Sequence, residues 1–184
     1  MQNYGNYIKL NITKQTDNRS QQYGNNRDSE FIERVVYTRR ISKVVKGGRR
    51  LRFNALVVVG DRSGQVGAGL GKAIAIPDAV RKATAEAKKN LVKIPLKGNT
   101  LPHDITVKKA GSIVVIKPAG EGTGIKAAGV MRAVLEFGGV RNVTGKSLGS
   151  RNPINTIQAT LEALRKLKSP QASSEVSQET TSED

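Results

Sequence analysis

Three alternating glycines constrain the fold of this chain more than any other feature of its sequence. Successive side chains of a β-strand point to opposite faces of the sheet. In segment 66–72 one face would be glycine only and the other aliphatic: Gly67, Gly69 and Gly71 against Val66, Ala68 and Leu70. Because a bare glycine face lets another backbone come very close, we expect either a helix or a ligand to pack tightly on this strand.

The surrounding residues predict three antiparallel strands followed by a helix. Segment 31–45 is rich in β-branched and aromatic residues, and apolar residues alternate again between Leu51 and Val59. Pro77 opens a helix as a first-turn residue. The apolar stripe expected on that helix consists of Val80, Ala83, Ala87 and Leu91. This order is the layout of a double-stranded-RNA-binding fold without its first helix.

The following residues predict a second α/β unit with the order ββαβα. Segments 104–109 and 112–117 form a hairpin, and Asn152 before Pro153 caps the last helix. Between them we expect a short strand over 141–144 and a helix that ends at the glycine pair 138–139. The apolar residues expected on this middle helix are Ile125, Met131, Val134 and Leu135. The predicted class is α+β: an N-terminal double-stranded-RNA-binding-like βββα unit followed by a ββαβα two-layer C-terminal domain.

Composition divides the chain into four predicted segments. Residues 1–29 are rich in Asn, Gln and Tyr and poor in aliphatic residues, so we expect a flexible arm. Residues 30–95 form the double-stranded-RNA-binding-like domain, and residues 96–168 form the C-terminal domain. Residues 169–184 are Ser, Thr and Glu with few apolar side chains, so we expect a disordered acidic tail.

Charge points to a polyanionic partner. Between Arg34 and Arg52 the chain has eight basic residues and no acidic residue, and its formal net charge is +16. Self-repulsion of this size disfavours a compact chain unless a polyanion screens it, and nucleic acid is the candidate we favour. A membrane surface is the weaker candidate, because no basic amphipathic helix carries large aromatics and no apolar run approaches the roughly 20 residues that span a bilayer.

The paired glycines at 47 and 48 form a turn between cations, which would let the backbone come close to a polyanion. The basic residues of the predicted helix that lie off its apolar stripe would also be free to meet phosphate: Arg81, Lys82, Lys88 and Lys89. The candidate RNA-binding residues are Arg39, Arg40, Lys43, Lys46, Gly47, Gly48, Arg49, Arg50, Arg52, Lys72, Lys82, Lys88 and Lys89. Aromatic residues make up only 4%, so base stacking is not expected to be the main binding device.

Catalytic, metal and cofactor sites are not expected. The chain has no cysteine and a single histidine, His103, which cannot supply the usual ligands of a transition metal. The scattered carboxylates form no nucleophile–base pair. Segment 67–72 lacks phosphate-loop spacing, and segment 120–124 is only a weak anion-binding pattern before a helix. We therefore predict neither an enzyme nor a bound cofactor.

Seven segments taken together carry a family resemblance. They are 40–49 (RISKVVKGGR), 53–61 (FNALVVVGD), 64–72 (GQVGAGLGK), 111–112 (GS), 118–125 (PAGEGTGI), 131–135 (MRAVL) and 149–155 (GSRNPIN). In this order they closely resemble the bacterial and plastid form of small-subunit ribosomal protein five. The resemblance runs from about Phe31 to Pro170. The Asn, Gln and Tyr bias before it is typical of an A/T-rich genome, which favours a plastid ribosome over a bacterial one.

The resemblance implies partners and further sites. It implies a structural protein on small-subunit rRNA, beside ribosomal proteins four and eight and close to messenger RNA where it enters the subunit. It also implies a contribution to translational accuracy with proteins four and twelve. The 40–49 loop matches the family loop that reaches rRNA of the neck and head. Gly124 and Arg132 match positions turned toward protein four, although on their own they suggest only a helix start and a solvated arginine.

Two alternatives from other classes stay open. The same basic sheet would suit a duplex-RNA-binding regulator that acts away from the ribosome. The 120–124 glycine loop would suit a small-molecule, kinase-like enzyme that uses a nucleoside triphosphate. Co-sedimentation with small subunits separates the first alternative from the ribosomal hypothesis, and an ATP-turnover assay tests the second.

Overall fold

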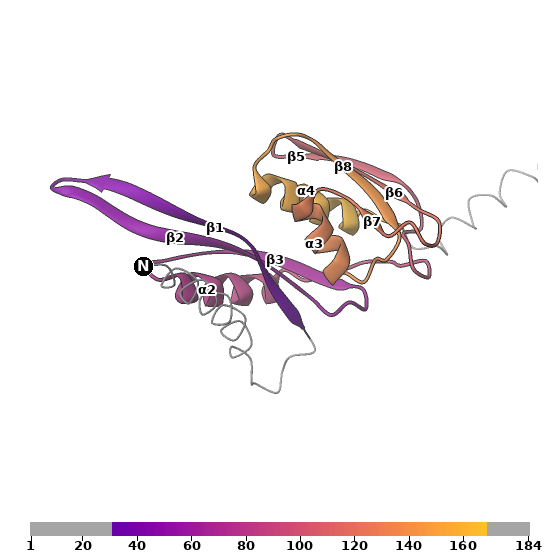
Figure 1. Cartoon of the computed structure of the whole chain (residues 1–184), viewed down its shortest axis with the longest axis horizontal. Helices are drawn as coiled ribbons and strands as arrows, with labels where there is room; N and C mark the ends of the chain where they lie inside the picture. Colours follow the sequence, from indigo (N-terminus) through magenta and orange to yellow (C-terminus); the bar gives the residue numbers. More distant parts are fainter. Residues whose placement is uncertain (1–30, 169–184) are drawn as a thin grey trace, which may run out of the picture. The chain divides into compact units, whose positions relative to one another are not determined.

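The structure is a computed structural model that describes residues 31–168, and the α+β class predicted from the sequence is confirmed. These residues form two four-stranded sheets and three helices (Figure 1). The predicted arm (1–29) and acidic tail (169–184) lie outside the described residues. The domain boundary after residue 95 stays a prediction.

The first sheet contains the predicted three strands and one short strand that was not predicted. Its strands are β1 (Ile32–Val45), β2 (Gly48–Gly60), β3 (Gln65–Ala73) and β4 (Val92–Lys93), in that order and all antiparallel. Helix α2 (Ile76–Lys89) follows β3, with Pro77 in its first turn. The predicted βββα order is therefore present, and β4 adds two residue pairs at the edge beside β3.

The glycine face of β3 is covered by a helix, which decides between the two expectations for it. A methyl group on Gly71 would overlap the carbonyl oxygen of Ala79, and methyl groups on Gly69 and Gly67 would overlap those of Ala83 and Ala87. The buried row of α2 is accordingly Ala79, Ala83 and Ala87, of which Ala83 and Ala87 belong to the predicted stripe. The row consists of small alanine side chains because the helix backbone touches the strand. The other two residues of the predicted stripe lie elsewhere: Val80 is only partly buried, and Leu91 follows the end of the helix.

The second half of strand β2, residues 55–60, is buried on both faces, although the alternating sequence pattern predicted only one buried face. Val57 and Val59 pack on α2 with Ala83 and Ala87. Leu56 and Val58, which point the other way, belong to a core shared with the second half of the chain. The strand is thus the middle layer of the molecule at this point.

The second half forms a two-layer unit. Its strands are β5 (Ile105–Lys109), β6 (Ser112–Pro118), β7 (Ile125–Lys126) and β8 (Val143–Gly149), and its helices are α3 (Gly129–Phe137) and α4 (Pro153–Arg165). The spatial strand order is β5-β6-β8-β7, with β7 and β8 parallel. Both helices pack together against the sheet face that buries Val114 and Ile116. The Asn152 side chain accepts a hydrogen bond from the Ile154 backbone N–H at 3.3 Å, which is the predicted cap of α4.

Two element boundaries in this half differ from the predictions. Ile125 is not helical: it lies in β7, pairs with Val143, and is separated from α3 by residues 127–128. The strand predicted over 141–144 is β8 and runs from Val143 to Gly149. The cause is Gly124, whose positive φ of 68° turns the chain, so that its carbonyl accepts the Val143 N–H at 3.1 Å.

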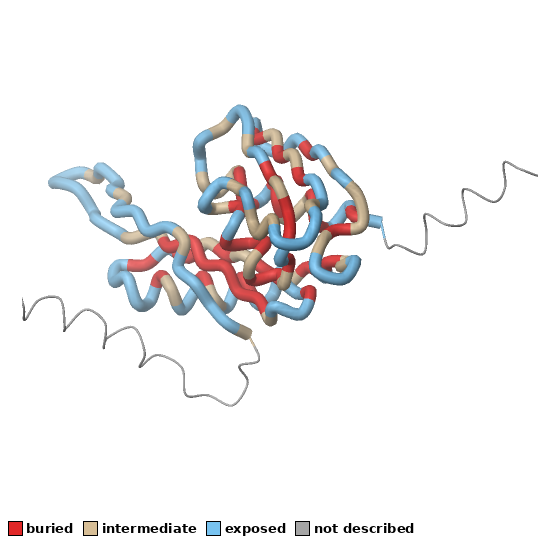
Figure 2. Tube along the Cα trace, turned by 45° about the vertical axis from the view of Figure 1, so that its right-hand side comes forward, coloured by how far each residue is buried: buried red, intermediate tan, exposed pale blue. Residues whose placement is uncertain are grey.

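A glycine-lined seam joins the two halves. The turn after β2 meets the end of α3, where the Arg62 N–H donates to the Phe137 carbonyl at 3.0 Å. Methyl groups on Gly60 and Gly139 would overlap the backbone at Phe137 and Arg62. Figure 2 shows the buried residues running without a break through this region. The two halves therefore share one hydrophobic core.

Candidate nucleic-acid interface

The β1–β2 hairpin extends beyond the rest of its sheet. Strand β3 pairs with β2 only as far as Phe53, so residues 41–52 continue as a two-stranded ribbon (Figure 1). We call residues 39–52, which also include the last pairs beside β3, the distal hairpin. Nearly all of their side chains are exposed (Figure 2). Nine of the predicted RNA-binding residues lie here: Arg39, Arg40, Lys43, Lys46, Gly47, Gly48, Arg49, Arg50 and Arg52. The structure thus gathers the acid-free run onto a single projecting element.

The turn at the tip needs its glycines for backbone conformation. Val45 pairs with Gly48, which leaves a two-residue loop of Lys46 and Gly47. Gly47 has φ of 90° and Gly48 has φ of 149°, and no other atom lies within 4 Å of a methyl group built on either residue. Side chains larger than glycine are therefore disfavoured by strain rather than by lack of space.

The cations of the distal hairpin have no acidic partner among the described residues. The ion pairs of the described residues involve other cations: Glu136 pairs with Arg34 at 3.5 Å, and Asp78 pairs with Arg81 at 4.0 Å. Glu162 pairs with Lys109 at 3.0 Å, and this hydrogen-bonded ammonium lowers the pKa of the Glu162 carboxyl. The charge of the hairpin is thus left for an external anion.

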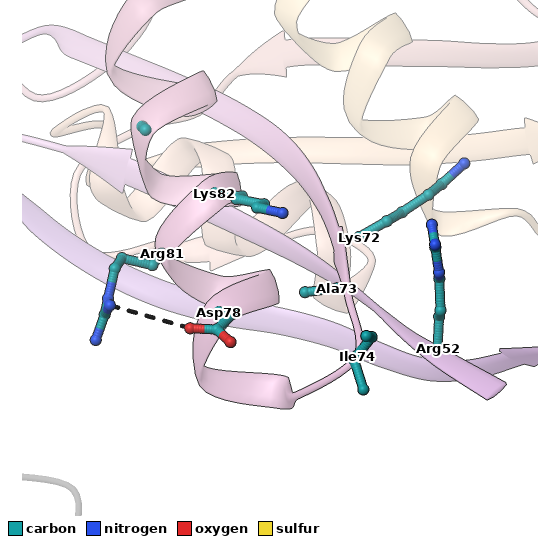
Figure 3. Close-up of a pocket in the computed structure, with 8 residues that line it drawn as sticks. Arg52, Lys72, Ala73, Ile74, Asp78, Arg81 and Lys82 are labelled. Atoms are coloured by element: carbon teal, nitrogen blue, oxygen red, sulfur yellow. Dashed lines mark ion pairs between the residues drawn. The ribbon is translucent and has the colours of Figure 1, made fainter.

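A hollow of about 600 Å³ lies at the base of the hairpin and is lined by cations from three elements. Arg52 comes from β2, Lys72 from β3, and Arg81 and Lys82 from α2. Figure 3 shows these side chains around the hollow, with the Arg81 guanidinium beside the Asp78 carboxylate. The hollow brings together three of the predicted residues and adds Arg81.

Arg81 was expected to stay free for phosphate because it lies off the apolar stripe of the helix, and it lines this hollow together with Lys82. Lys88 and Lys89, which were predicted, lie in the last turn of α2 and do not line this hollow. The register of β2 on β3 and the packing of α2 decide which cations meet there, and neither is readable from residue spacing.

Gly124 and Arg132 lie together on the second half of the chain. The Gly124 N–H donates to the Asn142 side chain at 3.1 Å, and an Arg132 N–H donates to the Ile125 carbonyl at 2.7 Å. Arg132 lies in the first turn of α3, because that helix begins at Gly129, later than predicted. The two positions thus lie on either side of β7 and each makes a local hydrogen bond.

A second cationic hollow, of about 590 Å³, surrounds Arg132. It is lined by Arg62, Arg132, Arg141 and Glu136. Arg62 has a positive φ of 57°, and its guanidinium lies 5.8 Å from the centre of the Phe137 ring. No sequence signal pointed to Arg62 or Arg141, because the seam between the halves places them beside α3.

Neither of the two glycine-rich segments forms a nucleotide-binding loop at the start of a helix. Segment 67–72 is part of β3 and is covered by α2, so it forms no nucleotide loop. Segment 120–124 ends five residues before α3 begins and does not present its N–H groups from the first turn of that helix. Within residues 31–168, no group of three or more His, Cys, Asp or Glu side chains could hold a metal ion. No helix of this part is long and apolar enough to cross a membrane.

The fold and the interface define a basic α+β protein whose projecting hairpin has no acidic partner among the described residues and suits a polyanion. Comparison with known families gives the particular identity. Residues 31–95 match the N-terminal domain of ribosomal protein S5, and residues 107–180 match its C-terminal domain, about three quarters of the chain together. The chain belongs to the ribosomal protein S5 family. It is an rRNA-binding protein of the small ribosomal subunit, from a family with a structural role in the ribosome.

Charge reversal on the distal hairpin tests the interface. We expect Lys43→Glu with Lys46→Glu to weaken incorporation into small subunits and rRNA protection at least tenfold, because attraction to phosphate becomes repulsion. Gly47→Val with Gly48→Val should act in the same direction by straining the turn. Chemical footprinting of reconstituted subunits measures both effects. Lys97→Glu is a control, because it reverses the charge of an exposed lysine that lies outside the hairpin, in the loop before β5. Normal protection in both hairpin variants would contradict the assignment.

Proposed function

We propose that this protein binds small-subunit rRNA on the side of the subunit where messenger RNA enters, and that its distal hairpin reaches rRNA of the neck and head. One observation carries the proposal: in a member of the S5 family, the most cationic element projects from the sheet with no acidic partner among the described residues. Duplex RNA offers phosphates, shape and 2′-hydroxyls, which suits a hairpin rich in arginine and poor in stacking aromatics.

The α3 region is proposed to contact ribosomal protein four, with protein eight as a second neighbour. Arg62, Arg132 and Arg141 around one hollow supply guanidinium groups that suit the carboxylates of a partner protein. Through this contact we propose that the protein contributes to translational accuracy together with proteins four and twelve. The family resemblance at Gly124 and Arg132 is the reason for choosing protein four.

The compartment is also a proposal. The Asn, Gln and Tyr bias of residues 1–29 favours a plastid ribosome over a bacterial one. Co-sedimentation tests the ribosomal function in either case. The full chain, added to small subunits that lack it, should sediment with them at about 150 mM salt, where nonspecific RNA binding is weak. A chain that binds free duplex RNA equally well and does not sediment with subunits would favour the off-ribosome regulator.

The α3 region gives a prediction for decoding. We expect Arg132→Leu to raise readthrough of a near-cognate stop codon several-fold, because a guanidinium that suits a partner carboxylate is lost. Subunit assembly should stay near normal, since Arg132 is exposed and its recorded bond is to the local Ile125 carbonyl. Arg132→Lys, which keeps the charge, should raise readthrough less.

Gly124 needs two variants because its φ of 68° strains most side chains. Gly124→Asn tolerates this conformation and serves as the control for Gly124→Arg, which adds both strain and bulk. No atom lies within 4 Å of a methyl group built at this position, so the arginine would extend from the surface. Raised readthrough in Gly124→Arg but not in Gly124→Asn is expected. Unchanged readthrough in both Arg132→Leu and Gly124→Arg would show that this surface does not face the partner proposed here.

A further inference from the structure

We propose that the two faces of the distal hairpin bind different chemical parts of RNA. One face binds the phosphate backbone, and the opposite face binds the ribose edge of a shallow minor groove. The inference rests on the proposed RNA-binding function and goes beyond it by assigning a ligand chemistry to each face.

The strand register separates the side chains into two sets. Residues that pair directly across an antiparallel ribbon share a face, and neighbours along a strand alternate. Lys43 pairs with Arg50, Ile41 with Arg52, and Arg39 with Asn54, which in turn pairs with Lys72 of β3. We call this set the cationic face; its charged members are Arg39, Lys43, Arg50, Arg52 and Lys72. Two of these residues, Arg52 and Lys72, also line the hollow at the base of the hairpin.

The opposite face has a different composition. Ser42 pairs with Leu51, and Val44 pairs with Arg49. We call this set, with Arg40, the mixed face. Val44 is 74% exposed and Leu51 is 50% exposed, so this face presents two aliphatic side chains to an external ligand. Residue Ala55, farther along the same face of β2, packs on α2, so the mixed face is the outward continuation of the helix-covered side of the sheet.

The chemistry of the two faces fits two parts of an RNA helix. Phosphate groups are bound by cations, and the cationic face supplies four on the hairpin alone. Aliphatic side chains gain little from contact with phosphate. The wide, shallow minor groove of A-form RNA instead exposes 2′-hydroxyls and ribose edges. A serine hydroxyl can hydrogen-bond to a 2′-hydroxyl, and aliphatic side chains can pack against the ribose. Arg40 and Arg49 at the sides of the mixed face favour RNA over a protein as the occupant.

Salt titration separates the two roles. The full chain is titrated with a 20-base-pair RNA duplex and with the DNA duplex of the same sequence, at about 50 to 300 mM KCl. Lys43→Gln with Arg50→Gln should weaken binding to both probes and reduce the slope of log affinity against log salt by about 1 to 2. Val44→Thr with Leu51→Thr should weaken RNA binding about 3- to 10-fold at every salt concentration, with an unchanged slope. It should change DNA binding little, because the narrower DNA minor groove has no 2′-hydroxyl.

Two controls distinguish the loss of an RNA contact from a loss of hairpin structure and from a general effect of removing exposed aliphatic groups. Threonine is β-branched and suits a strand at both positions, and amide hydrogen exchange at Val45 and Gly48 reports whether the hairpin remains paired. Leu148→Ser changes an aliphatic side chain that is 54% exposed but lies in β8, outside the hairpin and the hollow at its base, and it should bind as the wild type. The proposal is overturned if the threonine variant binds RNA like the wild type, if it lowers the salt slope as the glutamine variant does, or if RNA and DNA binding fall equally. Failure of wild-type chain to sediment with small subunits would instead count against the proposed function, whatever the duplex titrations show.

Discussion

Raising the salt concentration from about 50 to 200 mM is expected to weaken binding of this protein to small-subunit rRNA by about three to five decades, if six to ten phosphates are contacted. Each neutralised phosphate releases condensed counterions, and this release becomes less favourable as bulk salt rises. The distal hairpin and the hollow at its base present enough cations for that number: Arg39, Arg40, Lys43, Lys46, Arg49, Arg50, Arg52, Lys72, Arg81 and Lys82.

The measurement is a filter-binding titration of the full chain on small-subunit rRNA over a series of KCl concentrations. The plot of log affinity against log salt should be linear and steep. The hairpin variant Lys43→Glu with Lys46→Glu should be weaker at low salt and show a shallower plot. A wild-type affinity that changes less than about tenfold over this range would mean that phosphate neutralisation is not the main source of binding.

Adding one side chain to the glycine face of β3 is expected to lower the stability of the protein strongly. A methyl group at Gly71 would overlap the Ala79 carbonyl oxygen and lie 2.7 Å from the Ala83 backbone nitrogen. Both are helix backbone atoms that cannot turn aside. We therefore expect Gly71→Ala to lower the free energy of unfolding by about 3 kcal/mol, the upper end of ordinary overpacking, and Gly71→Val to lower it further. A loss of this size is a large part of the stability of a small protein.

Urea unfolding of the full chain, followed by far-UV circular dichroism, measures this loss. Gly120→Ala is the matched control, because Gly120 has an ordinary φ and no atom lies within 4 Å of a methyl group built there. It should change stability by no more than about 0.5 kcal/mol. If Gly71→Ala unfolds at the same urea concentration as Gly120→Ala, α2 does not lie against β3 at the distance described.

The charge pattern and the glycine pattern were readable from the sequence because each depends on residues close together in the chain. Eight basic residues without an acid between positions 34 and 52 predict a polyanion-binding element in any fold that exposes them. Glycine at every second position of a strand predicts a close neighbour whichever element supplies it. The succession of β1, β2, β3 and α2 along the chain follows from equally local signals, as do the last helix and its Asn152 cap.

Only the tertiary structure decided which distant residues meet. Pairing of β1 with β2 in one register divides the hairpin cations between two faces, and a shift by a single residue would exchange those faces. Close packing of α2 on β3 places Arg81 and Lys82 beside Arg52 and Lys72. The seam at Gly60 and Gly139 brings Arg62 to α3 across more than 60 residues of chain. The physical reason is common to these cases: local sequence sets conformation and charge, whereas the burial of shared apolar surface by β2, α3 and α4 sets the distances between elements.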